Sequence, residues 1–216
     1  MKKYIITSLL AIGLLINAAF AGNSAKLGYT SDFFYRGVQK SEEAVQSSIL
    51  LESELSGLKM SAHACTNQAV NNGADSYHLG LGGSKSFADG LLSVYAGLNH
   101  FEDKPGEAIS EFQLSLTSGS LLKPSLSAYR DLDDSLYTVE FSVSHSFDLD
   151  AVDLNVEALA GNTDLTNQTD RSYYLVGADV SKSVSENADL SVGVDYVDAD
   201  DIDREFVFGT SLTLSF

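Results

Sequence analysis

The sequence has too few basic residues, cysteines and long apolar runs for several common classes of protein. It carries 13 lysines and arginines against 30 aspartates and glutamates, a formal net charge of −17. Such a charge argues against nucleic acids and anionic surfaces as partners. Cys65 is the only cysteine, so no disulfide can form within the chain. After residue 21 there is no stretch of about 18 apolar residues, so no transmembrane helix is available there.

The first 21 residues have the pattern of a secretory signal peptide. Lys2 and Lys3 give a positive start, an apolar run from Ile5 to Ile16 follows, and Ala19-Phe20-Ala21 is a small-x-small cleavage site. The alternative is an N-terminal membrane anchor, but the run is shorter than the roughly 20 residues that a spanning helix needs. We therefore expect an exported protein with a signal peptide at 1–21 and one mature domain at 22–216. The signal carries two of the 13 bases and none of the acids, which leaves a mature net charge of −19.

A helical period is also missing after residue 24, and alternation with a period of two takes its place. In the stretch 135–147, Tyr137, Val139, Phe141 and Val143 point to one side, and the polar residues between them point to the other. Successive side chains of a β-strand lie on opposite faces, so this stretch predicts a strand with one apolar and one polar face.

The same alternation recurs in about twelve segments of roughly 9 to 12 residues, the length that a tilted strand needs to cross a bilayer. Short turns and longer polar loops alternate between them, as in bacterial outer-membrane barrels. The sequence thus predicts an all-β fold, an antiparallel transmembrane β-barrel of about twelve strands, with about ten as the fallback, in the outer membrane. Short turns would face the periplasm and longer loops the outside; a soluble β-sandwich is the alternative. The expected strands are 26–36, 45–55, 58–66, 76–87, 91–101, 109–118, 121–130, 136–147, 151–161, 172–183, 189–198 and 205–216, and the expected long loops are 37–44, 67–75, 102–108, 131–135, 162–171 and 199–204.

The two faces of these strands differ in charge. The apolar face, on which we place Tyr35 among many others, has no charged residue in its central band, where one would cost about 2–4 kcal/mol in a barrel. The opposite face has many small residues, which leave space in the lumen, and an excess of acids over bases, which predicts a channel that prefers cations. The predicted lumen-lining residues are Asp32, Arg36, Glu52, Glu54, Lys59, Glu111, Lys123, Glu140, Asp153, Glu157, Asp179 and Asp195.

The C-terminal segment alternates up to the last residue, which is a phenylalanine. Such an ending resembles the signal by which the barrel-assembly machinery recognises outer-membrane proteins. The residues that would form this insertion signal are Phe206, Phe208, Leu212, Leu214 and Phe216. Aromatic residues of the apolar face also gather at both ends of the expected strands, as in the two aromatic girdles of a barrel.

The first expected strand contains Ser31-Asp32-Phe33-Phe34-Tyr35-Arg36-Gly37. This segment resembles the opening of an uncharacterised proteobacterial outer-membrane family, the Gcw_chp conserved hypothetical proteins, which have Ser-Asn/Asp-aromatic-x-aromatic-Arg-Gly-x-Ser-Gln after the signal peptide. Gln39-Lys40 stands here where the family has Ser-Gln. The resemblance covers about thirteen residues; it implies a barrel and no established activity.

Arg36 is the residue of this segment with the most chemistry. It can line a constriction and bind an anionic solute, or it can form a structural ion pair with a lumen carboxylate such as Asp32 or Glu54, followed by a glycine that turns the chain. We favour the ion pair.

Side chains that carry catalysis or bind metals do not form a recognisable group. The four histidines are scattered without metal-ligand spacing. His145 and Ser146, with Asn155 further on, invite comparison with the twelve-stranded outer-membrane phospholipase, but adjacent residues face opposite sides of a strand. We expect neither an enzyme nor a cofactor. An acidic loop can offer oxygen ligands to Ca²⁺, although it lacks the glycine and distal glutamate of an EF-hand, and we favour a solvated loop; its acids are Asp198, Asp200, Asp201 and Asp203.

These observations favour a small porin-like channel for small cationic or neutral solutes. The main alternative is a non-conducting structural or surface-interaction barrel, whose acidic loops bind lipopolysaccharide, divalent ions or a partner. An outer-membrane enzyme is a third. The expected partners are outer-membrane lipid and lipopolysaccharide, the barrel-assembly machinery and small solutes, with no nucleic acid.

Overall fold

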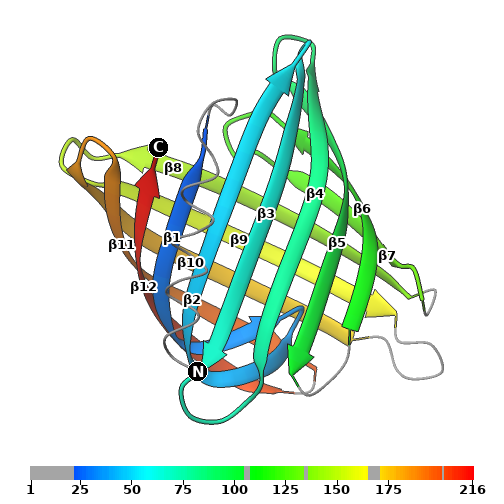
Figure 1. Ribbon diagram of the computed structural model, residues 1–216, viewed down its shortest axis with the longest axis vertical. Helices are drawn as coiled ribbons and strands as arrows, with labels where there is room; N and C mark the ends of the chain where they lie inside the picture. Colours follow the sequence, from blue (N-terminus) through cyan, green and yellow to red (C-terminus); the bar gives the residue numbers. More distant parts are fainter. Residues whose placement is uncertain (1–21, 105–107, 134–135, 165–170, 201) are drawn as a thin grey trace.

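The computed structural model describes residues 22–104, 108–133, 136–164, 171–200 and 202–216 (Figure 1). The predicted signal peptide at 1–21 lies outside these ranges. Within them, no helix has the length and apolar character needed to span a membrane.

Twelve β-strands form one closed antiparallel barrel in which each strand pairs with the next and the first pairs with the last. This confirms the fold class expected from the alternating pattern. The strands are β1 (Ser24–Tyr35), β2 (Val38–Leu55), β3 (Leu58–Ala69), β4 (Asp75–Phe87), β5 (Leu92–Lys104), β6 (Ala108–Ser118), β7 (Ser125–Asp131), β8 (Tyr137–Asp148), β9 (Asp153–Asp164), β10 (Arg171–Ser185), β11 (Ala188–Ala199) and β12 (Ile202–Ser215).

The barrel is apolar outside and polar inside, the inverse of a soluble protein. Large hydrophobic side chains stand exposed on the outer wall, for example Leu81 at 66%, Val192 at 60% and Phe208 at 60%. Inside, serine hydroxyls bond from strand to strand, as Ser115 does to Ser127 at 2.7 Å. Exposing such an outer surface to water is unfavourable because apolar area is expelled from water, whereas lipid hydrocarbon covers it without that cost.

One end of the barrel carries short turns. It is also where the seam begins, which is the pairing of the first strand, β1, with the last strand, β12. Ser24 pairs with Ser215 there, close to the β10–β11 turn. In the β2–β3 turn, Ser56 and Gly57 have φ of 53° and 75°, the left-handed pair that a two-residue hairpin requires. The β6–β7 connection is longer than expected because β7 begins at Ser125 rather than at residue 121; Lys123, with φ of 39°, therefore lies in this turn and not in a strand.

At the other end, the long loop expected at 37–44 does not exist. β2 begins at Val38, and a tight turn at Arg36 and Gly37, with φ of 51° and 73°, joins it to β1. The loop expected at 199–204 is also wrong in length, since β11 ends at Ala199 and β12 begins at Ile202. Polar residues in these stretches indicated loops, but residues 38–44 and 202–204 belong to strands.

The pairing register shows where β1 leaves the wall. Its ladder with β12 runs from Ser24↔Ser215 to Thr30↔Gly209, and from there on β1 continues paired with β2. The register with β2 shifts between Phe33 and Phe34, as at a β-bulge. The extra residue is Lys40 of β2, so the alternation of β1 itself is unbroken. Tyr35 nevertheless stacks on Phe101 in the lumen and does not, as expected, face the apolar outside, because the end of the β1–β2 pair bends inward. The end of this β1–β2 pair bends across the mouth of the barrel (Figure 1).

Candidate functional site

Residues 31–43, which we call the inward hairpin, cross the lumen and contact the far wall. If β1 and β2 stayed in the barrel wall over their whole length, they would contact, besides each other, only their neighbours β12 and β3. Instead Tyr35 stacks on Phe101 of β5 with ring centroids 4.2 Å apart, and Lys40 forms an ion pair with Asp103 of β5 at 2.7 Å. These contacts place the hairpin as a plug at the loop end of the barrel.

The tip of the inward hairpin is seated against β10 and β11. Gly37 is buried, and a Cβ atom at this position would lie 2.6 Å from Tyr173 Cβ and 3.0 Å from Ala199 Cβ. Both distances are shorter than ordinary carbon contacts of about 3.5–4.0 Å. The close approach therefore requires glycine for lack of a side chain as well as for its positive φ.

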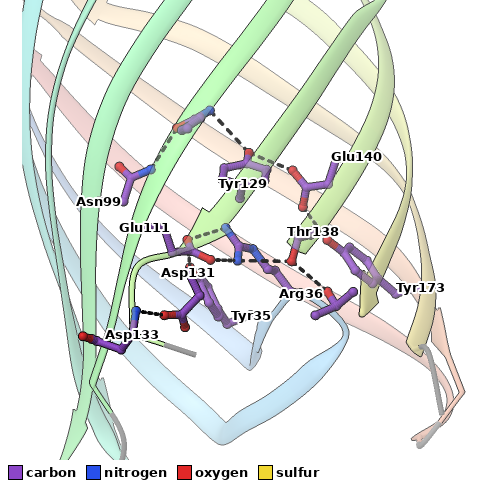
Figure 2. A network of polar contacts seen from close by, with 12 residues as sticks. Tyr35, Arg36, Asn99, Glu111, Tyr129, Asp131, Asp133, Thr138, Glu140 and Tyr173 are labelled. Carbon is purple, nitrogen blue, oxygen red and sulfur yellow. Dashed lines mark hydrogen bonds and ion pairs between the residues drawn. The ribbon is translucent and has the colours of Figure 1, made fainter. Parts of the chain in front are cut away.

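Arg36 beside this glycine is held by three strands of the opposite wall, β6, β7 and β8. Its guanidinium donates to both carboxylate oxygens of Glu111, with Nη2 to Oε2 at 2.6 Å, and lies 4.2 Å above the ring centroid of Tyr129 (Figure 2). Thr138 Oγ1 is 3.5 Å from Nη1. We call Glu111, Tyr129 and Thr138 the Arg36 cradle.

The ion pair in the cradle is almost completely buried from solvent. The side chains of Arg36 and Glu111 are 13% and 5% exposed. Burial by itself opposes a charged guanidinium, but the hydrogen bonds and the charge of Glu111 outweigh it and raise the pKa of Arg36, which lies in the turn, above its ordinary value. Removing one partner of such a pair leaves a buried charge without compensation, which is strongly unfavourable.

A second carboxylate, Glu140 of β8, stands next to the cradle and is held by hydroxyl groups. Tyr129 and Tyr173 donate to its two oxygens at 2.9 and 2.5 Å. The chain of contacts continues from Tyr129 through Gln113 to Asn99 across β6 and β5 (Figure 2). The network fixes Tyr129 and Glu140 in the wall independently of the hairpin.

Between the plug and the short-turn end, the lumen contains acid-lined space. One cavity of about 280 Å³ is lined by Lys26, Glu157, Asp179 and Asp195, and an adjoining one of about 210 Å³ shares these three acids. Asn155 donates to Asp179 at 3.1 Å. Among the described residues that line the larger cavity, three carboxylates face one base, so the local potential is negative.

The sequence-predicted lumen residues fall into three groups. Arg36 and Glu111 meet directly, Glu140 adjoins them, and Asp32, on the inward hairpin, accepts a bond from Gln39 at 3.0 Å. The partner of Arg36 is therefore Glu111, not Asp32 or Glu54 as expected. The acids of the second group line the cavities; they are Glu157, Asp179 and Asp195. The third group lies toward the short-turn end: Glu52, Glu54, Lys59, Lys123 and Asp153, of which Lys59 pairs with Glu52 at 2.9 Å.

The remaining candidates lie outside the lumen or at its rim. The side chains of the expected insertion signal are exposed on the outer wall: Phe206, Phe208, Leu212, Leu214 and Phe216. In the acidic loop, Asp198 pairs with Arg204 at 3.2 Å and Asp200 accepts from the Ser172 amide at 2.7 Å. Asp201 and the side chain of Asp203 lie outside the described part of the chain. Within that part, no three histidine, cysteine or acidic side chains could hold a metal ion.

The histidine considered for hydrolysis faces away from its expected partners. His145 packs on Phe147 with ring centroids 4.4 Å apart, and its Nδ1 lies 2.8 Å from the carbonyl oxygen of Leu121. Asn155 bonds to Asp179 on the lumen side, so the wall separates it from His145. The phospholipase arrangement is not formed by these residues.

Several residues of the site were not predicted. Tyr129, Tyr173 and Phe101 form the seat of the hairpin, and Lys40 and Asp103 pin its flank. Their contacts join strands far apart in the sequence, which alternation cannot reveal. A local signal existed in Arg36-Gly37, since an Xaa-Gly pair between alternating stretches is typical of a two-residue hairpin.

Comparison with known proteins identifies the fold. No protein-family model matches the chain, and no curated protein is similar in sequence. Among solved structures, the KdgM porin is 13% identical with a TM-score of 0.59, covering 89% of this chain and 99% of its own. An outer-membrane channel from Pseudomonas putida F1 is 9% identical with a TM-score of 0.61 over 92% and 97%. Outer-membrane phospholipase A from Escherichia coli is 12% identical with a TM-score of 0.56 over 92% of both. The chain thus has the fold of bacterial outer-membrane barrels, a fold that porins and channels share with an enzyme.

Proposed function

We propose that this protein is a porin-like channel of the bacterial outer membrane for small cationic or neutral solutes, closed at its extracellular mouth by the inward hairpin. The observation that carries the proposal is an acid-lined lumen behind a plug made from the barrel's own strands. In this orientation the short turns face the periplasm, as in other outer-membrane barrels. The likeness to porins supports the proposal at the level of the fold.

The distribution of charge favours cations. Arg36, Lys40 and Lys59 are each neutralised by an acid, whereas Glu157, Asp179 and Asp195 share one cavity with a single base among its described residues. Charges that line a narrow aqueous pore attract ions of opposite sign and exclude those of like sign. One KdgM structure is a complex with oligogalacturonate, a polyanion; the lumen of this chain suits the opposite charge.

A non-conducting structural barrel is the second candidate, and the seated hairpin is the observation that favours it. A plug with a dry ion pair at its tip blocks passage for as long as it stays in place. An experiment must therefore compare the natural protein with a variant in which the plug is removed.

Single-channel recording in planar bilayers under a KCl gradient provides the test. The unplugged variant replaces residues 34–40 by Asn-Gly, which joins the paired residues Phe33 and Ser41 through a two-residue turn. We expect the refolded natural protein to conduct rarely, and the variant to conduct steadily with a reversal potential that favours K⁺. If neither protein conducts, the structural alternative replaces the channel; if the variant favours Cl⁻, the proposed preference for cations is wrong.

A further inference from the structure

The Arg36 cradle has the chemistry of a receptor for a guanidinium group. Two oxygens of Glu111 match two nitrogens of Arg36, and the ring of Tyr129 covers the guanidinium plane from 4.2 Å. A planar guanidinium fits a carboxylate in this two-bonded way, and it also stacks on aromatic faces, whereas an ammonium acts as a point charge. The cradle therefore discriminates by shape as well as by charge.

The cradle belongs to the wall and does not depend on the hairpin for its shape. Glu111, Tyr129 and Thr138 lie on the neighbouring strands β6, β7 and β8, and Tyr129 is fixed by its bonds to Gln113 and Glu140. Only Arg36, and Tyr35 with its hydroxyl 3.4 Å from Glu111, come from the hairpin. When the hairpin leaves, a preformed site remains that offers a carboxylate, an aromatic face and a hydroxyl to the lumen.

We infer that the Arg36 cradle is a binding site for small solutes that carry a guanidinium group, and that Arg36 occupies it as a tethered substitute. The inference rests on the proposed channel and names its solute class and its opening signal. A free guanidinium solute competes with Arg36 for Glu111, and its binding holds the inward hairpin out of the lumen. A tethered group has an effective concentration in the millimolar range, so a free solute of comparable affinity must reach that range to compete.

The surroundings of the cradle favour this competition. Glu140 adds a second negative charge near Arg36, and the acid-lined cavities concentrate cations in the lumen. Where Arg36 is removed and the hairpin stays seated, Glu111 loses its partner while it is still covered, which is costly and favours any cation that fits.

Chemical rescue of the Arg36→Ala protein tests the binding step without requiring conduction. Refolded protein is titrated with guanidinium chloride at millimolar concentrations, well below denaturing levels, by calorimetry and by the unfolding temperature, with sodium chloride of equal ionic strength as the reference. We expect guanidinium to bind Arg36→Ala and raise its unfolding temperature, and methylammonium to bind about tenfold or more weakly, because it makes one charged contact in place of two.

Two variants control for charge and for general destabilisation. Arg36→Ala combined with Glu111→Gln removes the carboxylate and should abolish the guanidinium effect. Lys40→Ala breaks the hairpin's other ion pair, with Asp103, but keeps Arg36 as a competitor for the cradle, so guanidinium should bind it more weakly than it binds Arg36→Ala. Equal binding of the two cations to Arg36→Ala, or binding that persists without the Glu111 charge, would overturn the inference.

Current recordings then separate this inference from the channel itself. In the natural protein, guanidinium should increase the open time, and in Arg36→Ala it should reduce the current by occupying the cradle. Steady conduction by Arg36→Ala with no specific guanidinium binding contradicts the cradle and leaves the channel standing. Specific binding without conduction in any variant supports the cradle and removes the channel.

Discussion

The seat of the inward hairpin predicts the effect of one added methyl group, Gly37→Ala. The new Cβ would lie 2.6 Å from Tyr173 Cβ, so the tip must withdraw by about 1 Å to restore ordinary contact distances. That movement also disturbs the two-bonded contact of Arg36 with Glu111. Overpacking of this kind costs about 1–3 kcal/mol, which corresponds to a shift of about 5- to 150-fold in the ratio of seated to withdrawn hairpin.

Gly57→Ala is a matched control for backbone strain. Gly57 also lies in a two-residue turn, its φ is 75° against 73° for Gly37, and a Cβ there would meet nothing within 4 Å. Both substitutions therefore strain the backbone to a similar extent, and only Gly37→Ala collides with a far wall.

Open probability in planar bilayers is the measurement. We expect Gly37→Ala to open at least several-fold more often than the natural protein. Gly57→Ala should have the open probability of the natural protein. Equal open probabilities in the two variants would refute the idea that contact at the tip holds the hairpin in place.

Three further expectations concern the lumen and the wall. Glu157→Gln should lower the preference for K⁺ over Cl⁻ in an unplugged channel more than Glu140→Gln does, because Glu140 is already held by two tyrosine hydroxyls; an equal effect contradicts this. Val192→Arg, on the outer face of β11, should destabilise the barrel in vesicles by about 2–4 kcal/mol in denaturant unfolding, whereas Ser191→Arg on the lumen face should cost clearly less. Deleting Phe216 should lower the yield of folded, heat-modifiable protein in the outer membrane, and an unchanged yield would count against its role in insertion.

The wall could be predicted from the sequence because its pattern is imposed on every strand. A closed barrel between lipid and a wet lumen requires strict alternation, and the stretch around Phe141 shows it as clearly as the chain end at Phe216. The number of strands and their antiparallel order follow from counting such stretches. The constraint is local, so local reading suffices.

The plug could not be predicted for two physical reasons. The β1–β2 pair leaves the wall after Thr30 and bends into the lumen, so Tyr35 lies inside although its parity is that of the outer face, and nothing in the composition of that stretch marks the bend. The partner of Arg36 is 75 residues away on the far wall, a contact that depends on the closed shape of the barrel. The polar stretch after Gly37 indicated a loop because its backbone pairs with the other arm of the hairpin and with the loop at 70–74, where no apolar outer face is required.

The point at which β1 leaves the wall has a consequence for the balance between the closed and open barrel. The ladder of β1 with β12 stops at Thr30 and Gly209, although β12 itself continues to Ile202. Residues 31–35 cannot occupy the lumen and extend this ladder at the same time. A hairpin that swings out exchanges its side-chain contacts with the far wall for backbone hydrogen bonds along the seam. Each position of the hairpin therefore has stabilising contacts of its own. The free energies of the two positions lie closer together than the plug contacts alone imply.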